Sequence, residues 1–106
     1  MKRLDLGFKP ERVGRWWHRG EEIDVVAYDR QNVALFEVKW KNLRQGDAKR
    51  VLKALEKKAE LLPLRGNYRF GVIARKLEDK DGLRKEGFLA FDLEDIIRPR
   101  PRFPSR

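Results

Sequence analysis

The clearest pattern along the chain is a pair of stretches in which apolar and polar residues alternate with a period of two. These stretches are residues 22–28 and 33–40, and such alternation is typical of half-buried β-strands. The polar residues 29–32 between them, Asp-Arg-Gln-Asn, are typical of a tight connection. The pattern therefore predicts two antiparallel strands joined as a hairpin.

In the first predicted strand, alternation places Ile23, Val25 and Ala27 on one face. The other face carries Glu22 and Asp24. Acids are poor strand residues, and a charge beside an apolar sheet face is costly unless it is paired or exposed. Solvent, the charges themselves or a metal ion must compensate them.

The second predicted strand repeats this arrangement, with Glu37 and Lys39 on one face. The four-residue connection sets a register in which Asp24 lies opposite Glu37, with Cβ atoms about 4.5–5.5 Å apart. Glu22 lies opposite Lys39 in the same register. The hairpin is therefore expected to place an aspartate and a glutamate side by side, flanked by a lysine.

Two adjacent carboxylates repel each other, which raises a pKa unless a cation lies between them. A divalent ion such as Mg²⁺ or Mn²⁺ suits a carboxylate pair completed by water and phosphate oxygens. Lys39 would then hold a phosphate or stabilise the attacking hydroxide. The alternative is a surface network in which Lys39 and arginines neutralise both acids.

Downstream of the hairpin, apolar residues recur at helical spacing over residues 48–62, which predicts a helix with Asp47 as its N-cap. Two more strands are expected at 68–75 and 88–91, followed by a helical turn at 92–98.

The remaining stretches of the domain, residues 1–14 and 77–87, are expected to be irregular. A hairpin followed by a helical crossover predicts an α/β fold with a mixed sheet and the helix packed on one face. We expect a single domain over residues 1–97 and a basic, proline-rich tail at 98–106.

The composition narrows the class of protein. No stretch has the length and apolarity of a membrane span, and the charged N-terminal stretch lacks a signal-peptide core. The chain has no cysteine, so disulfides and thiolate metal sites are excluded. These features predict a cytoplasmic protein without a membrane partner. Its 41% of charged residues is typical of a thermophilic source.

The formal net charge of +9 indicates a polyanionic partner, most simply nucleic acid. The basic residues expected to contact phosphates are Arg15, Arg19, Lys41, Arg44 and Lys49. Their alternative role is a solvated rim. No pattern among them indicates base-specific readout, so recognition of backbone and shape is expected.

The aromatic residues around the hairpin have two possible roles. Trp16, Trp17 and Trp40 are expected to complete the core, and the alternative is stacking on bases or sugars. His18 is the only histidine of the chain, and we expect it to be a polar neighbour of the site rather than a general base.

The triplets Glu22-Ile23-Asp24 and Glu37-Val38-Lys39, separated by 12 residues, resemble the signature of the PD-(D/E)XK nuclease superfamily. That superfamily includes many restriction endonucleases and archaeal Holliday-junction resolvases. The stretch GRWWHRGEEIDVVA…FEVKWKN looks more narrowly like the nuclease-like C-terminal domain of archaeal ATPases of uncertain role. The likeness is clearest over residues 14–42 and extends to about residue 97.

The resemblance implies a restriction-endonuclease-like fold and assigns roles to the hairpin residues. Asp24 and Glu37 would be ligands of Mg²⁺ or Mn²⁺, together with the backbone carbonyl of Val38. Lys39 would be the catalytic lysine.

The same resemblance implies two auxiliary residues, and the chain differs from the family pattern in its first core helix. Glu22 would be an auxiliary acid or a partner of the lysine, and Gln45 a further polar residue of the site. The family core usually begins with a helix that supplies another acid, and this chain has little room for one before Arg15. That helix is therefore expected to be missing or shortened, with Glu11 as the nearby substitute. The chain would then be a piece of a longer protein, a reduced relative that dimerises, or a relative without activity.

Three functions remain open at this point. The first is a metal-dependent DNA endonuclease. The second is an inactive nuclease-fold module that binds DNA or a partner, associated with an ATPase domain upstream or in trans. The third is a protein-interaction domain serving such an ATPase. Salt-dependent DNA binding counts against the third, and metal-dependent cleavage separates the first two.

Overall fold

The computed structural model describes residues 6–96, which form five strands and three helices. The strands are β1 (Arg12–His18), β2 (Glu21–Tyr28), β3 (Asn32–Leu43), β4 (Asn67–Leu77) and β5 (Leu89–Asp92). The helices are α1 (Gln45–Ala59), α2 (Lys80–Lys85) and α3 (Leu93–Ile96). The tail predicted at 98–106 lies outside the described residues.

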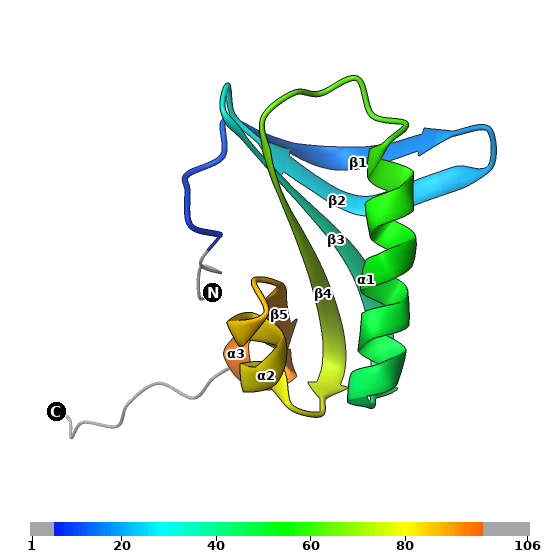
Figure 1. Ribbon diagram of the computed structural model, residues 1–106, viewed down its shortest axis with the longest axis vertical. Coiled ribbons are helices and arrows are strands. Elements are labelled where there is room, and N and C mark those ends of the chain that lie inside the picture. Colours follow the sequence, from blue (N-terminus) through cyan, green and yellow to red (C-terminus); the bar gives the residue numbers. More distant parts are fainter. Residues whose placement is uncertain (1–5, 97–106) are drawn as a thin grey trace, which may run out of the picture.

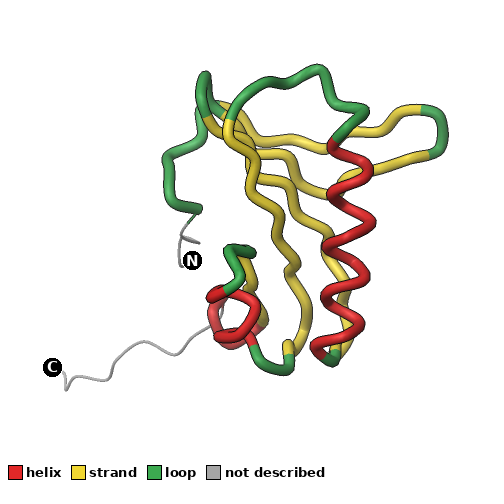
Figure 2. Tube along the Cα trace, viewed as in Figure 1, coloured by secondary structure: helices red, strands yellow, loops and turns green. Residues whose placement is uncertain are grey.

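All five strands form one sheet in the order β1-β2-β3-β4-β5. Neighbours are antiparallel from β1 to β3 and parallel from β3 to β5. The long helix α1 connects the parallel strands β3 and β4 and lies along the sheet (Figures 1 and 2). The predicted mixed α/β sheet with a crossover helix is therefore confirmed.

The hairpin connection forms as predicted, and its side chains explain why. The Asp29 carboxylate accepts hydrogen bonds from the backbone amides of Gln31 and Asn32, at 2.8 and 2.7 Å. This local turn is one that aspartate favours. It brings Tyr28 opposite Val33, which is the register that the four-residue connection predicts.

Three elements differ from the expectation. The stretch expected to be irregular up to residue 14 enters strand β1 at Arg12, because it pairs along β2. Helix α2 occupies part of 77–87, capped by the Asp79 side chain on the Gly82 amide at 3.1 Å. Helix α1 has Arg44, not Asp47, as its N-cap, and its first amide is bound by the Glu78 carboxylate. Distant partners decided the local structure at β1 and at the start of α1, whereas the cap of α2 is a local contact.

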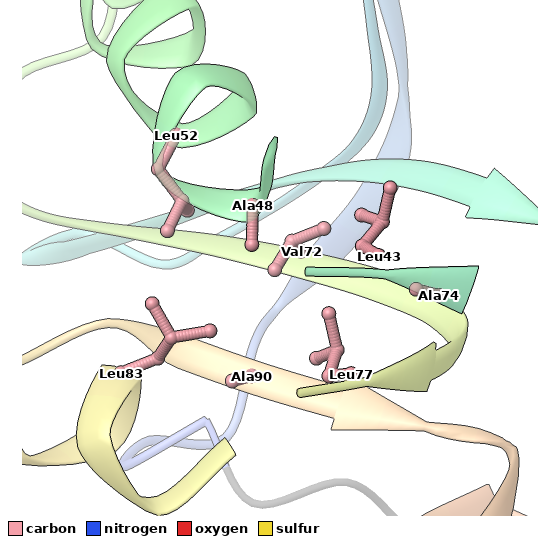
Figure 3. Close-up of a cluster of buried hydrophobic side chains, with 8 residues drawn as sticks. All are labelled: Leu43, Ala48, Leu52, Val72, Ala74, Leu77, Leu83 and Ala90. Carbon is pink, nitrogen blue, oxygen red and sulfur yellow. The ribbon is translucent and has the colours of Figure 1, made fainter. Parts of the chain in front are cut away.

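The main core lies between the sheet and the helices on one of its faces. Apolar residues of α1 and α2 pack there on residues of β3, β4 and β5 (Figure 3). The members of this cluster are Leu43, Ala48, Leu52, Val72, Ala74, Leu77, Leu83 and Ala90. We call this side of the sheet the helix face.

The opposite side of the sheet is covered differently. Phe36, Leu89 and Phe91 are buried there, and Leu6 and Phe8 of the N-terminal segment pack against them. No helix precedes β1 within residues 6–96. None of the helices in this same range is long and apolar enough to cross a membrane.

We expect Gly71→Ala to destabilise the fold. A Cβ at Gly71 would lie 2.5 Å from Phe36 Cε2 and 2.8 Å from Leu89 Cβ, and both neighbours are buried. Overpacking of this kind costs about 1–3 kcal/mol. The free energy of unfolding, measured by urea denaturation, should fall by that amount. Gly46→Ala is the control, because a Cβ there meets nothing within 4 Å. Equal stability of both variants would contradict the prediction.

Candidate functional site

The two central strands separate at the acidic residues. The β2–β3 ladder extends from the turn as far as the pair Val25 and Phe36. At the next position the Asp24 carboxylate, through Oδ2, accepts a hydrogen bond from the backbone amide of Val38 at 2.8 Å. A side chain therefore replaces backbone pairing at this point and holds Asp24 against the strand that carries Glu37.

A β-bulge in β2 lies beside this opening. Gly14 of β1 is opposite Val26. Two residues further along β1, Trp16 is opposite Ile23, which is three residues from Val26 along β2. The extra residue of β2 shifts the alternation, so Ile23 is buried with Val26 beneath α1. The prediction that placed Ile23 on the opposite face is wrong for this reason. Bulges of this kind are frequent next to active sites.

Glu37 is a buried acid with a cation as partner. Its side chain is only 10% exposed, and Lys58 of α1 donates a hydrogen bond to its Oε2 at 2.9 Å. Lys58 also donates to the backbone carbonyl of Glu22 at 2.7 Å, so one ammonium joins α1 to both strands of the hairpin. Burial raises the pKa of Glu37, Lys58 opposes this effect, and the neighbouring Asp24 carboxylate raises the pKa further.

The sequence interpretation missed Lys58. This residue lies at the margin of the apolar helix stripe, three positions after the buried Leu55. A lysine at that position can reach over the sheet while its aliphatic stem packs on apolar surface. Glu37 is therefore neutralised by Lys58 of α1 and not by Lys39 or an arginine, the cations that the alternative surface network named.

Lys39 lies on the helix face together with Glu37. Glu37 is level with Val72 and Lys39 with Ala74, and both of these β4 residues pack beneath α1. The two charged residues are thus alternate positions of one strand on one face, as predicted.

The predicted pairing of Glu22 with Lys39 is wrong. The β2–β3 ladder ends before it reaches these residues, and Glu22 instead forms an exposed ion pair with Arg15 at 3.0 Å. The bulge in β2 explains the difference, because it turns Glu22 away from the helix face.

Both carboxylates of the site are hydrogen-bonded. Asp24 uses Oδ2 for the Val38 amide, and Glu37 uses Oε2 for Lys58. These two bonds use one oxygen of each carboxylate, and a side-chain hydrogen bond between Asp24 and Glu37 is among the causes that raise the pKa of Glu37. The repulsion that raises the pKa of Glu37 also favours a cation between the two groups. In the same range no cluster of three or more histidine, cysteine or acidic side chains is arranged around a metal position. The acids that the described residues bring together here are therefore the pair Asp24 and Glu37.

Gln45 lies away from this pair of acids. Its side chain donates to the Asp79 carboxylate at 2.5 Å, which joins the start of α1 to the connection between β4 and α2. Gln45 lies thirteen positions before Lys58 on α1, which is roughly 20 Å along the helix axis.

The predicted phosphate-binding residues lie on several elements. Arg15 and Arg19 belong to the β1–β2 hairpin, whereas Lys41 and Arg44 lie at the end of β3 and in the connection to α1. Lys49 forms an ion pair with Glu86 at 2.9 Å. The first four are exposed, and among them Arg15 forms the ion pair with Glu22.

The tryptophans divide between core and surface. Trp16 packs beneath α1, as expected, and its ring lies 6.0 Å from that of His18. Trp17 and Trp40 are 70% and 58% exposed, so the expectation that they complete the core is wrong. Alternation along the strands turns both residues away from the helix that buries Trp16.

We expect Lys58→Met to destabilise the metal-free protein in a pH-dependent way. At pH 7 the loss of its partner leaves Glu37 as a buried unpaired anion, at a cost on the order of 2 kcal/mol. Because Lys58 lowers the pKa of Glu37, its loss should raise that pKa further above the ordinary 4.5, and the variant should recover stability relative to wild type as the pH falls through the raised pKa. Urea unfolding in EDTA at pH 7 and pH 4 measures the difference.

Lys57→Met is the matched control, because Lys57 is the exposed neighbour on the same helix. It should change stability little at either pH. A Lys58→Met loss of equal size at both pH values would show that the ion pair with Glu37 is not its cause.

Sequence comparison finds relatives without an assigned activity. Residues 1–51, which include the hairpin and the start of α1, match the family DUF234, described as archaeal and bacterial proteins of unknown function. Uncharacterized protein MJECL04 of Methanocaldococcus jannaschii is 43% identical over 94 residues, which cover 86% of this chain and 21% of that protein. The chain thus spans about a fifth of the length of this curated relative.

Among solved structures, the chain is similar to a repair endonuclease from Pyrococcus abyssi, with a TM-score of 0.46 and 23% sequence identity. The superposition covers 77% of this chain and 38% of that chain.

Proposed function

We propose that this chain is a metal-dependent DNA endonuclease domain of the PD-(D/E)XK type. One observation carries the proposal: the carboxylates of Asp24 and Glu37 are neighbours, and Lys39 follows on the same face of β3. This constellation lies on a hairpin whose strands separate at the acids. The hairpin, crossover helix and parallel strand follow one another in the order that the superfamily resemblance implies.

In this proposal each residue of the site has a separate role. Asp24 and Glu37 hold Mg²⁺ or Mn²⁺ through one carboxylate oxygen each, with the Val38 backbone carbonyl as a further ligand. The ion supplies charge stabilisation at the phosphate and a water of lowered pKa. The Lys39 ammonium orients the scissile phosphate and stabilises negative charge on it. Lys58 keeps the buried Glu37 ionised and fixes its orientation from α1.

An inactive module is the second candidate, and two observations favour it. The Lys58 ammonium already neutralises Glu37, and the described residues supply no third acid to the site. Glu11, the substitute considered for the missing helix, is exposed just before β1. Such a module would bind DNA or a partner, including an ATPase domain upstream or in trans.

If the enzyme cleaves both strands of a duplex, so small a domain would act as a homodimer.

We expect metal-dependent cleavage that Glu37→Ala abolishes. Labelled duplex, branched and single-stranded DNA are incubated with Mg²⁺, Mn²⁺ or EDTA, and products are separated on gels. Loss of a metal ligand should reduce the rate by at least about 100-fold, and so should Lys39→Met, because each removes charge stabilisation at the phosphate.

Glu56→Ala is the control, because Glu56 is an exposed acid of α1 that makes no contact with the site. Cleavage that persists in EDTA or in Glu37→Ala would reject the two-carboxylate site. Binding of DNA without cleavage on any substrate would favour the inactive module.

A further inference from the structure

Exposed apolar side chains gather on part of the sheet. Five large apolar residues are exposed among residues 6–96, and four of them lie on β1 and β3. These four are Val13, Trp17, Val38 and Trp40, whereas Leu61 lies after α1. The two tryptophans are the most notable, because indole rings are usually at least half covered in a folded domain.

The four residues share the side of the sheet opposite the helix face. Val13 is opposite Ala27, and Val38 is level with Ile73, and both partners belong to the cluster on that side. Trp17 follows Trp16, whose ring packs beneath α1, so Trp17 points the other way.

The β3–β4 register shifts between Lys39 and Asn42, but Leu43 again packs on the helix face, so alternation from Lys39 to Leu43 places Trp40 on the side of Val38. We call the surface formed by Val13, Trp17, Val38 and Trp40 the tryptophan face.

The tryptophan face carries two arginines and one acid. Arg15 lies between the two apolar residues of β1, and Arg75 lies two positions after Ile73 on β4; both are exposed. The acid on this part of β2 is Glu22, and its charge is matched by the ion pair with Arg15. The three charges named here sum to a net positive charge, which favours a polyanionic partner.

The tryptophan face is also hollowed at one end. An open depression of about 410 Å³ is lined by Arg15, Trp17, Gly20 and Glu22. It places an indole ring beside a guanidinium group at the end of the β1–β2 hairpin.

We propose that the tryptophan face binds single-stranded nucleic acid, with Trp17 and Trp40 stacking on bases and Arg15 and Arg75 contacting phosphates. Surfaces that bind single strands combine aromatic rings with a positively charged path for the backbone. A duplex keeps the faces of its bases stacked inside, so stacking of this kind selects unpaired bases. The inference does not depend on catalysis, because the residues involved lie on the side of the sheet opposite Glu37 and Lys39.

A second copy of this chain is the competing occupant, because tryptophan and arginine are also enriched at protein interfaces. The charge of the tryptophan face argues against it, since two copies would bring like charges together. The test therefore measures oligomeric state as well as binding.

The experiment is fluorescence anisotropy of a labelled 15-nucleotide oligo-dT and of a matched duplex, with EDTA present to prevent cleavage. Trp17→Ala and Trp40→Ala should each weaken oligo-dT binding about 5- to 100-fold, with a smaller effect on the duplex. Trp40→Phe should retain most of the affinity, because it keeps an aromatic ring. Leu61→Ala is the control for loss of an exposed apolar side chain elsewhere, and circular dichroism verifies folding.

Two results would overturn the inference. One is unchanged oligo-dT affinity in the folded Trp17→Ala/Trp40→Ala double variant. The other is a wild-type dimer in analytical ultracentrifugation that becomes a monomer in the double variant, since the tryptophans would then be an interface between copies. Failure of DNA cleavage, by contrast, would bear on the two-carboxylate site and leave this inference standing.

Discussion

The ion pair between Lys58 and Glu37 connects the parts of this fold that define the site. One ammonium, presented by α1, bonds the buried carboxylate on β3 and a backbone carbonyl on β2. Without such a partner, the free-energy cost of removing the carboxylate from water would exceed the stabilisation it gains within the sheet. The position of α1 over the hairpin and the ionisation of Glu37 therefore depend on the same contact.

The hairpin is regular near its turn and irregular at the acids. Asp29 closes the turn, and the ladder pairs residues as far as Val25 and Phe36. Beyond this point the bulge in β2 and the bond from the Val38 amide to Asp24 replace ordinary pairing. A regular ladder would have used the Val38 amide for backbone pairing, whereas this geometry uses it to hold a carboxylate beside Glu37.

The sheet separates two chemistries because successive residues of a strand point to opposite faces. Glu37 and Lys39 lie on the helix face, whereas Val38 and Trp40 belong to the tryptophan face. Nuclease chemistry on one side and single-strand binding on the other are therefore proposals about alternate residues of β3. The variants that test one side of the sheet leave the residues on the other side unchanged.

Local sequence determined the parts of this protein that depend on short-range physics. Alternation and the polar connection at 29–32 were sufficient to predict the hairpin, its register from Tyr28–Val33 to Val25–Phe36 and the proximity of Asp24 to Glu37, and helical periodicity predicted α1. Only the tertiary structure decided which charges pair. Lys58 reaches Glu37 across 21 residues of sequence, and the bulge that redirects Ile23 and Glu22 arises from pairing with β1. Periodicity also cannot show whether a face is covered, and so the exposure of Trp17 and Trp40 emerged only when the packed elements were in place.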